Sequence, residues 1–159
     1  MCENQFSVED AFEKYCDTVY RLALARTKNP FDAEDVTQTV FMKLCKNTAP
    51  FTDEEHLKAW LLKVTVNTSK NLLTTAWKRL TEPLNENILG DTPEVDGTYP
   101  AVMKLSEKYR TVIHLFYYED YSCAQIAKIL DTTEATVKTR LRRAREKLGE
   151  LLKGEDFGV

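Results

Sequence analysis

Residues 122–148, SCAQIAKILDTTEATVKTRLRRAREKL, have the pattern of two short helices joined by a tight turn. Ser122 and Gln125 have the spacing of a capping box, which would start the first helix. Three polar residues, Asp131, Thr132 and Thr133, then fill the turn. The residues that would bury the first helix are Ile126, Ile129 and Leu130. The pattern predicts a helix-turn-helix, which restricts this part of the chain to a compact helical fold.

The second of these helices is strongly basic, and its apolar residues form a single stripe. They are spaced by four, three and four positions: Val137, Leu141, Ala144 and Leu148. Opposite the stripe lie Ala135, Thr139, Arg142 and Arg143, and on its flanks lie Thr136, Lys138, Arg140 and Arg145. Arginine can fork onto a guanine edge, and flanking cations can reach phosphates. A charged helix can also be merely solvated, but the capped partner helix and the short turn favour contact with DNA.

The composition allows two small domains or one medium domain, because the 159 residues are 43% hydrophobic and 30% charged. The net charge of −3 argues against a protein that coats nucleic acid. Its distribution is uneven, however. Residues 80–103 contain five acids and no Lys or Arg, whereas six of the eleven bases in residues 104–159 fall on the second helix of the pair.

The first eighty residues read as helices, since they contain no alternating run of strand type and no glycine. Ser7 can cap a helix over residues 8–26, a second helix begins near Asp32 and runs to about Lys46, and a third spans residues 54–80. The expected inner faces are Phe12, Tyr15, Val19, Leu22 and Ala23, then Ala33, Val36, Val40 and Leu44, then Leu57, Trp60, Leu61, Val64 and Leu72. These helices predict one small domain over residues 1–80.

Two outward faces of this domain carry residues that could contact a partner. The second helix presents Asp35, Gln38 and Met42, a mixed polar and apolar set for which plain solvent exposure is the alternative explanation. The third helix presents Lys63, Asn67, Lys70 and Trp77, and lysines interleaved with an aromatic ring suit single-stranded DNA. The alternative for Trp77 is partial cover by neighbouring segments.

Residues 81–100 are rich in acids and punctuated by proline and glycine, which is typical of a flexible linker without a core of its own. A further helix over residues 106–118 would cover the back of the helix-turn-helix with Tyr109, Val112, Ile113, Phe116 and Tyr117. The predicted fold class is therefore all-α, with two small helical domains, residues 1–80 and 101–159, joined by an acidic linker.

Enzymatic chemistry has little support in the sequence. Four scattered cysteines form no CxxC pair, and the two histidines stand far apart, so we predict reduced thiols and no metal site. No nucleophile with a base partner and no phosphate-cradling glycine loop is present, and no cofactor is expected. An acidic N-terminus and the lack of a long apolar run predict a cytoplasmic chain without membrane insertion.

Three segments in this order resemble the extracytoplasmic-function (ECF) sigma factors, the two-domain branch of the bacterial sigma-70 family. DAEDVTQTVFMKL, residues 32–44, is similar to region 2.2, and AWLLKVTVN, residues 59–67, is similar to the start of regions 2.3 and 2.4. KYRTVIHLFYYEDYSCAQIAKIL and EATVKTRLRRAREKL are similar to region 4. Asp131 replaces a frequent glycine in the turn, and Asp tolerates a left-handed backbone better than most residues.

The resemblance implies a role for each outward face. Region 2.2 would dock on the clamp helices of the polymerase β′ subunit through Asp35, Gln38, Phe41 and Met42. Regions 2.3 and 2.4 would open the −10 element and hold its single strand with Lys63, Asn67 and Lys70, while a loop containing Asn47, Thr48 and Phe51 receives a flipped base. Region 4 would bind the −35 element with Thr136, Lys138, Thr139, Arg140, Arg142 and Arg143, its other surface resting on the β flap.

The expected function is that of an alternative sigma factor, which directs core polymerase to specific promoters and assists their opening without catalysis of its own. Bacterial RNA polymerase core and promoter DNA are the implied partners, an anti-sigma factor is a further candidate, and the free protein is expected to be a monomer. The main alternative is a helix-turn-helix regulator that binds an operator without polymerase. That alternative leaves the region 2.2 similarity and the long linker without a role.

Overall fold

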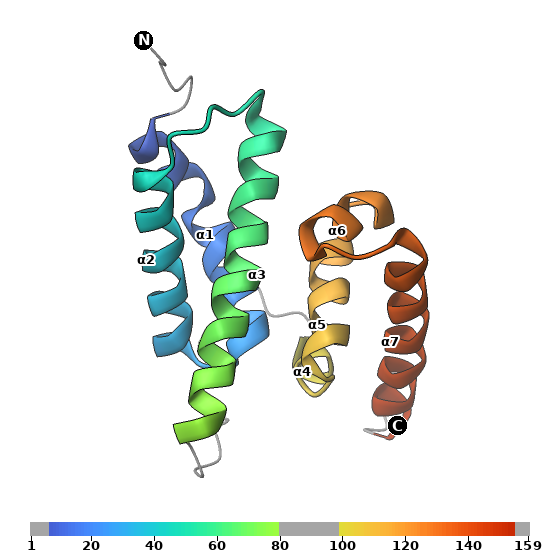
Figure 1. Cartoon of the computed structure of the whole chain (residues 1–159). Coiled ribbons are helices and arrows are strands. Elements are labelled where there is room, and N and C mark those ends of the chain that lie inside the picture. Colours follow the sequence, from blue (N-terminus) through green and yellow to red (C-terminus); the bar gives the residue numbers. More distant parts are fainter. Residues whose placement is uncertain (1–6, 80–98, 155–159) are drawn as a thin grey trace. The chain divides into compact units, whose positions relative to one another are not determined.

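The computed structural model describes residues 7–79 and 99–154, and the chain divides into two compact units (Figure 1). Every regular element in the described residues is helical, which confirms the predicted all-α class. Most of the predicted acidic linker, residues 81–98, lies outside the described residues. Its last two residues, Tyr99 and Pro100, form the start of a short helix rather than the end of a linker.

The described residues of the first unit form three helices, α1 (Val8–Thr27), α2 (Pro30–Lys46) and α3 (Glu54–Arg79), and each packs against the other two (Figure 1). Their shared core consists of aliphatic side chains that are almost completely buried: Val19, Leu22, Leu24, Val36, Val40, Leu57, Leu61 and Leu62. Burial of such side chains is the main stabilising contribution in a small helical domain.

Capping side chains set the starts of α1 and α2. The Ser7 hydroxyl accepts a hydrogen bond from the amide of Asp10 at 3.0 Å, as the sequence predicts. The second helix starts two residues before the predicted Asp32, because the Asn29 side chain caps it and Pro30 occupies the first turn. Lys28 adopts the left-handed conformation, with φ of 57°, and ends α1 just before this cap.

The inner face of α1 differs from the prediction at one position. Ala11, rather than Phe12, continues the buried series of Tyr15, Val19 and Leu22. Phe12 is 46% exposed, and its ring meets the Phe41 ring edge-on with 5.0 Å between centroids. The small alanine side chain lets α1 lie close to its neighbours, so the larger ring is left at the edge of the core.

The inner face of α3 is rotated about the helix axis from the predicted one. Leu57 and Leu61 are buried as expected, whereas Trp60, Val64 and Leu72 are only half-buried. Polar residues missing from the prediction complete this face, since Thr65 and Ser69 are fully buried. The Ser69 hydroxyl accepts a hydrogen bond of 2.6 Å from Nε of Arg26, which satisfies part of a buried guanidinium.

The second unit contains α4 (Tyr99–Met103), α5 (Glu107–Ile113), the π-helical turn η2 (His114–Tyr118), α6 (Cys123–Leu130) and α7 (Glu134–Gly154). Helix α7 packs against α4, α5 and α6 (Figure 1). Ile126, Val137 and Leu141 lie at the centre of this packing and are almost inaccessible. The predicted pair of helices joined by a short turn is confirmed, but the second helix is not short, since α7 continues to Gly154.

The π-helical turn overturns the predicted burial of residues 116 and 117. An α-helix continued through these positions would place Phe116 and Tyr117 inward, but Phe116 is half-buried and Tyr117 is 51% exposed. The amide of Glu119 donates to the carbonyl of His114, five residues back, and this wider turn rotates the later side chains outward. His114 and Leu115 are buried in their place.

The capping box at the start of α6 leads to a first prediction. Both of its hydrogen bonds form, from the Gln125 amide to the Ser122 hydroxyl at 3.2 Å and from the Ser122 amide to the Gln125 side chain at 2.9 Å. Ser122→Ala should therefore destabilise α6 by about 1 kcal/mol. Faster amide hydrogen exchange in α6 measures the effect.

Ser106 supplies the control for this experiment, because it occupies the N-cap of α5 without a side-chain capping hydrogen bond. Ser106→Ala should change the free energy of opening of α5, as measured by amide exchange, by only a few tenths of a kcal/mol. An equal cost at both positions would contradict the role given to the Ser122 hydroxyl.

Candidate nucleic-acid interface

A left-handed residue and a hydroxyl cap fix the turn between α6 and α7. Asp131 has φ of 56° and ψ of 49°, which confirms that aspartate can take the place of a turn glycine here. The Thr133 hydroxyl accepts a hydrogen bond from the Thr136 amide at 3.1 Å and lies 2.8 Å from the Thr136 hydroxyl. Thr136 is half-buried, and its amide already has a hydrogen-bond partner at the start of α7.

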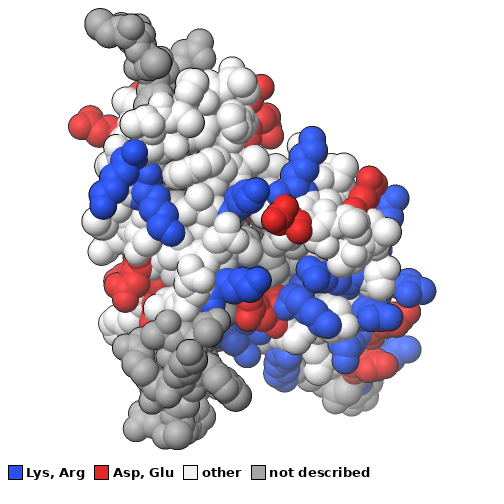
Figure 2. Space-filling model, in the orientation of Figure 1, with Lys and Arg blue, Asp and Glu red and all other residues white. Residues whose placement is uncertain are grey.

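The outer surface of α7 carries the predicted basic residues. Lys138, Arg142 and Arg143 are exposed, while Thr139 and Arg140 are half-buried beside them. Lys138 lies 3.3 Å from the Glu134 carboxylate, one turn earlier. No acidic side chain of the described residues pairs with Arg142 or Arg143, so the charge of these two guanidinium groups is open to a ligand. Lys and Arg side chains gather on the part of the molecule that contains α7 (Figure 2).

Arg145 differs from the arginines before it, because it is held against η2. Its Nε donates to the Tyr117 hydroxyl at 2.7 Å, and its guanidinium lies 5.5 Å from the Phe116 ring centre and 5.6 Å from that of Tyr117. Together these interactions fix the side chain and satisfy part of its donor capacity. Arg145 thus has a structural role that its place in the basic run does not indicate.

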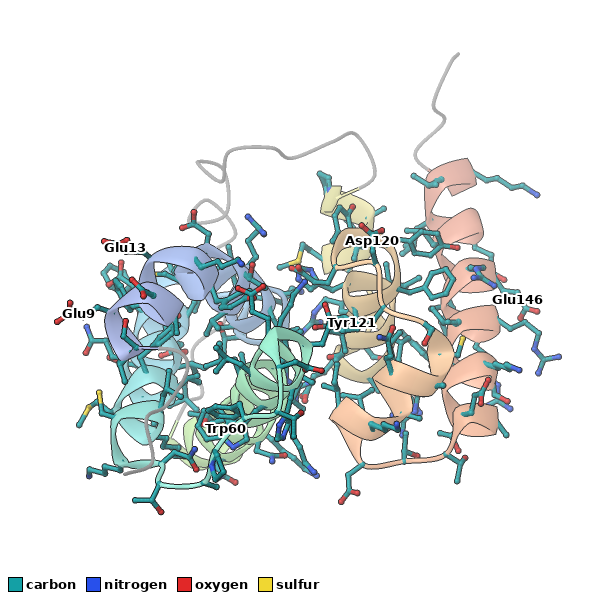
Figure 3. The ribbon with its side chains drawn as sticks, turned by 90° about the horizontal axis from the view of Figure 1, so that it is seen from above. Glu9, Glu13, Trp60, Asp120, Tyr121 and Glu146 are labelled. Carbon is teal, nitrogen blue, oxygen red and sulfur yellow. The ribbon has the colours of Figure 1, made fainter. Side chains whose placement is uncertain are left out.

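The outward face of α3 brings together the residues predicted for single-stranded DNA. Lys63, Asn67 and Lys70 follow one another at helical spacing and are all exposed. The side chain of Trp77 lies outside the described residues. Trp60, labelled in Figure 3, is half-buried and one turn before Lys63, so an indole stands at the N-terminal end of this face.

The loop between α2 and α3 is tied to that indole. The Phe51 ring meets the Trp60 ring edge-on at 5.7 Å and the His56 ring at 5.2 Å. Asn47 ends α2, and its side-chain amide donates to the Ala49 carbonyl at 2.8 Å. Thr48 is exposed between them. Of the three predicted loop residues, Phe51 is thus the one that an aromatic contact joins to α3.

The outward face of α2 contains three of the four residues predicted to contact polymerase. Asp35, Gln38 and Met42 are exposed, Met42 by 59%. Phe41, the fourth predicted residue, is only 5% exposed, and its ring meets the Phe12 ring edge-on where both line a groove beside this face. Phe31, which is absent from the predicted face, is 69% exposed and continues the same helical face by one turn.

This face borders a groove of about 600 Å³ between α1 and α2. Its floor contains the rings of Phe12 and Phe41, and Met42 and Gln38 line the α2 side. Glu9 and Glu13 project from α1 along the opposite side (Figure 3). The groove thus combines an apolar floor with acidic side chains, a surface suited to a partner with apolar and basic residues.

The described cysteines are free thiols, at positions 16, 45 and 123. Burial raises the pKa of the Cys16 thiol, and the adjacent Asp17 carboxylate raises it further, so this thiol is a weak nucleophile at neutral pH. Cys2 lies outside the described residues. In the described part of the chain no cluster of three or more His, Cys, Asp or Glu side chains has the geometry to hold a metal ion.

Comparison with known proteins identifies the chain. Residues 11–79 match the model of sigma-70 region 2, and residues 100–148 match that of sigma-70 region 4. The ECF RNA polymerase sigma-E factor of Haemophilus influenzae is 32% identical, over 77% of this chain and 76% of its own. The chain belongs to the ECF sigma factors of the sigma-70 family. As such it is a non-enzymatic initiation factor, an alternative sigma subunit of RNA polymerase.

Two further relatives place this sigma factor in its family. The ECF RNA polymerase sigma factor SigW of Bacillus subtilis is 29% identical over 94% of this chain and 91% of its own. The sigma factor RpoE of Bartonella quintana, solved in complex with the anti-sigma factor NepR, has the same fold. That likeness has a TM-score of 0.72 at 21% identity and covers 91% of this chain and 96% of that one. Among the described helices of this sigma factor, none is long and apolar enough to cross a bilayer.

Proposed function

We propose that each unit of this sigma factor reads its own promoter element, α7 binding the −35 element and the outer face of α3 binding the −10 element, while α2 docks on polymerase. The observation that carries the proposal is the pair Arg142 and Arg143, exposed on the outer face of a capped helix-turn-helix and without an acidic partner among the described residues. Such groups are costly to leave without a counter-charge near other cations, and DNA supplies one.

The shape of α7 supports major-groove binding. Small side chains, Ala135 and Thr139, occupy its first two turns on the outer side, so the backbone can approach base edges closely. Arg142 and Arg143 follow one turn later, where their guanidinium groups can fork onto guanine. Lys138 and Arg140 diverge to either flank and are proposed to contact phosphates.

The face of α3 is proposed to hold the non-template strand of the −10 element. Lys63 and Lys70 provide cations two turns apart, and Asn67 between them provides an amide for hydrogen bonds to a base. The loop with Asn47, Thr48 and Phe51 is proposed to receive one flipped base. Support comes from the contact between Phe51 and Trp60, which places the loop at the end of the same face.

A second prediction concerns this face. Lys63→Ala with Lys70→Ala should slow promoter opening. The slope of log K for open-complex formation against log salt concentration should also become smaller, by about 0.7 for each single-strand phosphate that loses its contact with a lysine. Permanganate reactivity of thymines near the start site measures the opening. Lys58→Ala, at a half-buried position on the same helix, is the control and should leave opening unchanged. Full opening with the double variant would contradict the proposed −10 face.

The proposal for α2 is that Phe31, Asp35, Gln38 and Met42 form one continuous surface for the β′ clamp helices. All four are exposed and share a helical face. Phe31 and Met42, at the two ends of this face, add exposed apolar side chains to its polar ones, a mixture that suits a protein partner. Phe41 is proposed to meet the partner only at the adjoining groove, whose lining it shares with Phe12.

The two DNA contacts need not be strong individually. When the chain is bound to polymerase, the effective concentration of each promoter element near its unit is high, so two modest affinities combine into tight promoter binding. A chain with a net charge of −3 gains little from non-specific attraction to DNA and would depend on core enzyme for promoter binding.

A gel shift with and without core polymerase tests this dependence. On a promoter fragment at physiological salt, the purified chain alone should give no specific complex, and the chain with core polymerase should give one that survives competitor DNA. Tight, specific binding by the chain alone would contradict the proposal and favour a helix-turn-helix regulator that acts without polymerase. Core polymerase without the chain is the control for its own DNA binding.

A further inference from the structure

Helices α5 and α7 form a small basic niche beside the proposed DNA-binding face. It has a volume of about 260 Å³ and is lined by Lys108 and Tyr109 from α5 and by Ala135, Thr136, Thr139, Arg140 and Arg143 from α7. Cations and hydroxyls make up most of its lining, and no carboxylate lines it. Its functional groups therefore form a set of hydrogen-bond donors around one small volume.

Lys108 is the unexpected member of this set, because it lies outside the helix-turn-helix. It stands in the first turn of α5, its side chain is exposed, and its ammonium group lies 5.1 Å from the centre of the Tyr109 ring. The Tyr109 ring is itself buried in the second unit, and the Lys147 ammonium of α7 lies 5.9 Å from its centre. The Lys108 ammonium thus lies close to a buried ring, and both residues share the lining of the niche with the first turns of α7.

The cations of the niche are not neutralised within the described part of the protein. Neither Lys108 nor Arg140 nor Arg143 pairs with an acidic side chain there. Helix packing brings these three residues to the lining of one niche, and an anion bound there would reduce the repulsion among their charges. The mixture of a point-charge ammonium, guanidinium forks and hydroxyl donors matches the oxygens of a phosphate.

We infer that this niche binds one backbone phosphate of the −35 element, with Lys108 contacting the DNA strand beside α7 from outside the helix-turn-helix. The inference rests on the proposed binding of α7 to that element. Arg143 is shared between the base-reading face and the niche, so a phosphate held there would fix the rotation of α7 in the groove. DNA is favoured over an acidic protein surface because two residues that line the niche, Thr139 and Arg143, also belong to the face of α7 that is proposed to read the −35 element.

The test uses holoenzyme and a promoter fragment from which that holoenzyme initiates. Lys108→Ala should reduce the salt slope of promoter binding by about 0.9 and weaken binding at low salt by roughly three- to tenfold. Lys108→Arg should restore both, because the charge returns. Lys153→Ala, which removes an exposed cation from the far end of α7, should leave the slope unchanged.

Neutral methylphosphonates, placed one at a time along the −35 element, locate the contact. One position should weaken binding of the wild-type holoenzyme but leave that of Lys108→Ala unaffected. An unchanged slope in Lys108→Ala, or equal sensitivity of both proteins at every position, would overturn the inference. A loss of core polymerase binding in Lys108→Ala would overturn it as well, in favour of a protein contact.

These failures are distinguishable from failure of the proposed function. If Arg142→Ala with Arg143→Ala abolishes use of the −35 element while Lys108→Ala has no effect, the proposed function stands and only the niche is refuted. If neither variant affects that element, the assignment of α7 is refuted together with the niche.

Discussion

Replacing Arg142 and Arg143 with alanine will abolish transcription that depends on the −35 element while leaving core polymerase binding intact. Both side chains are exposed on α7 and have no acidic partner among the described residues, so their removal should not disturb the fold. Removal of two base-reading side chains, each worth about 1–3 kcal/mol, corresponds to a fall of roughly thirtyfold or more in promoter affinity. Run-off transcription and core pull-down measure the two outcomes.

A pair of conservative substitutions separates the effect of side-chain charge from that of side-chain geometry. Arg142→Lys with Arg143→Lys keeps both charges but removes the planar forks, so it should retain the salt slope of promoter binding and lose discrimination between −35 sequences. Equal loss of promoter use and core binding in the alanine pair would contradict the assignment of α7 to DNA.

The second large effect is expected on α2. Asp35→Ala combined with Gln38→Ala and Met42→Ala should weaken association with core polymerase by roughly thirtyfold, the scale of an interface hot spot. All three side chains are exposed, so the variant should remain folded. Competition with wild-type chain for a limiting amount of core polymerase measures the change.

The matched control removes exposed carboxylates from the other two helices of the same unit, as Asp17→Ala with Glu55→Ala. It should bind core polymerase as the wild type does. Undiminished binding of the α2 variant would refute the proposed docking surface, and equal weakening by the control would indicate a general charge effect instead.

Local sequence signals predicted much of this fold. Ser7, Ser122 and Gln125 cap the helices as their spacing indicates, because capping depends on groups within one turn. The apolar stripe of α7 is largely correct for the same reason, with Val137, Leu141 and Ala144 buried and Leu148 half-buried. The outward faces of α2 and α3 followed from the same periodicity.

Features that depend on packing between helices could not be predicted in this way. Periodicity places Phe12 and Phe41 on their helices without showing which of them tertiary packing covers, and only the folded unit shows Phe41 buried and Phe12 partly exposed. The π-helical turn shifts the register by one residue, and its buried ends meet as a pair, His114 Nε2 lying 3.3 Å from Glu119 Oε2. No local pattern in the sequence marks this turn.

Two residues of the candidate site escaped prediction for different reasons. Phe31 precedes Asp32, the predicted start of α2. Because the helix was predicted to start too late, Phe31 was not included in the outward face that it continues. Lys108 is far from α7 in the sequence, and only the packing of α5 on α7 brings it to the basic face. Extending each predicted face by one turn toward the N-terminus would have found Phe31, but not Lys108.

Run-off transcription from a library of genomic fragments, with core polymerase in the presence and absence of this chain, tests the central claim most directly. The account predicts that the chain creates new start sites that share two spaced sequence elements, and that Arg142→Ala with Arg143→Ala removes them. If core polymerase with the chain initiates only where it initiates alone, the account is contradicted.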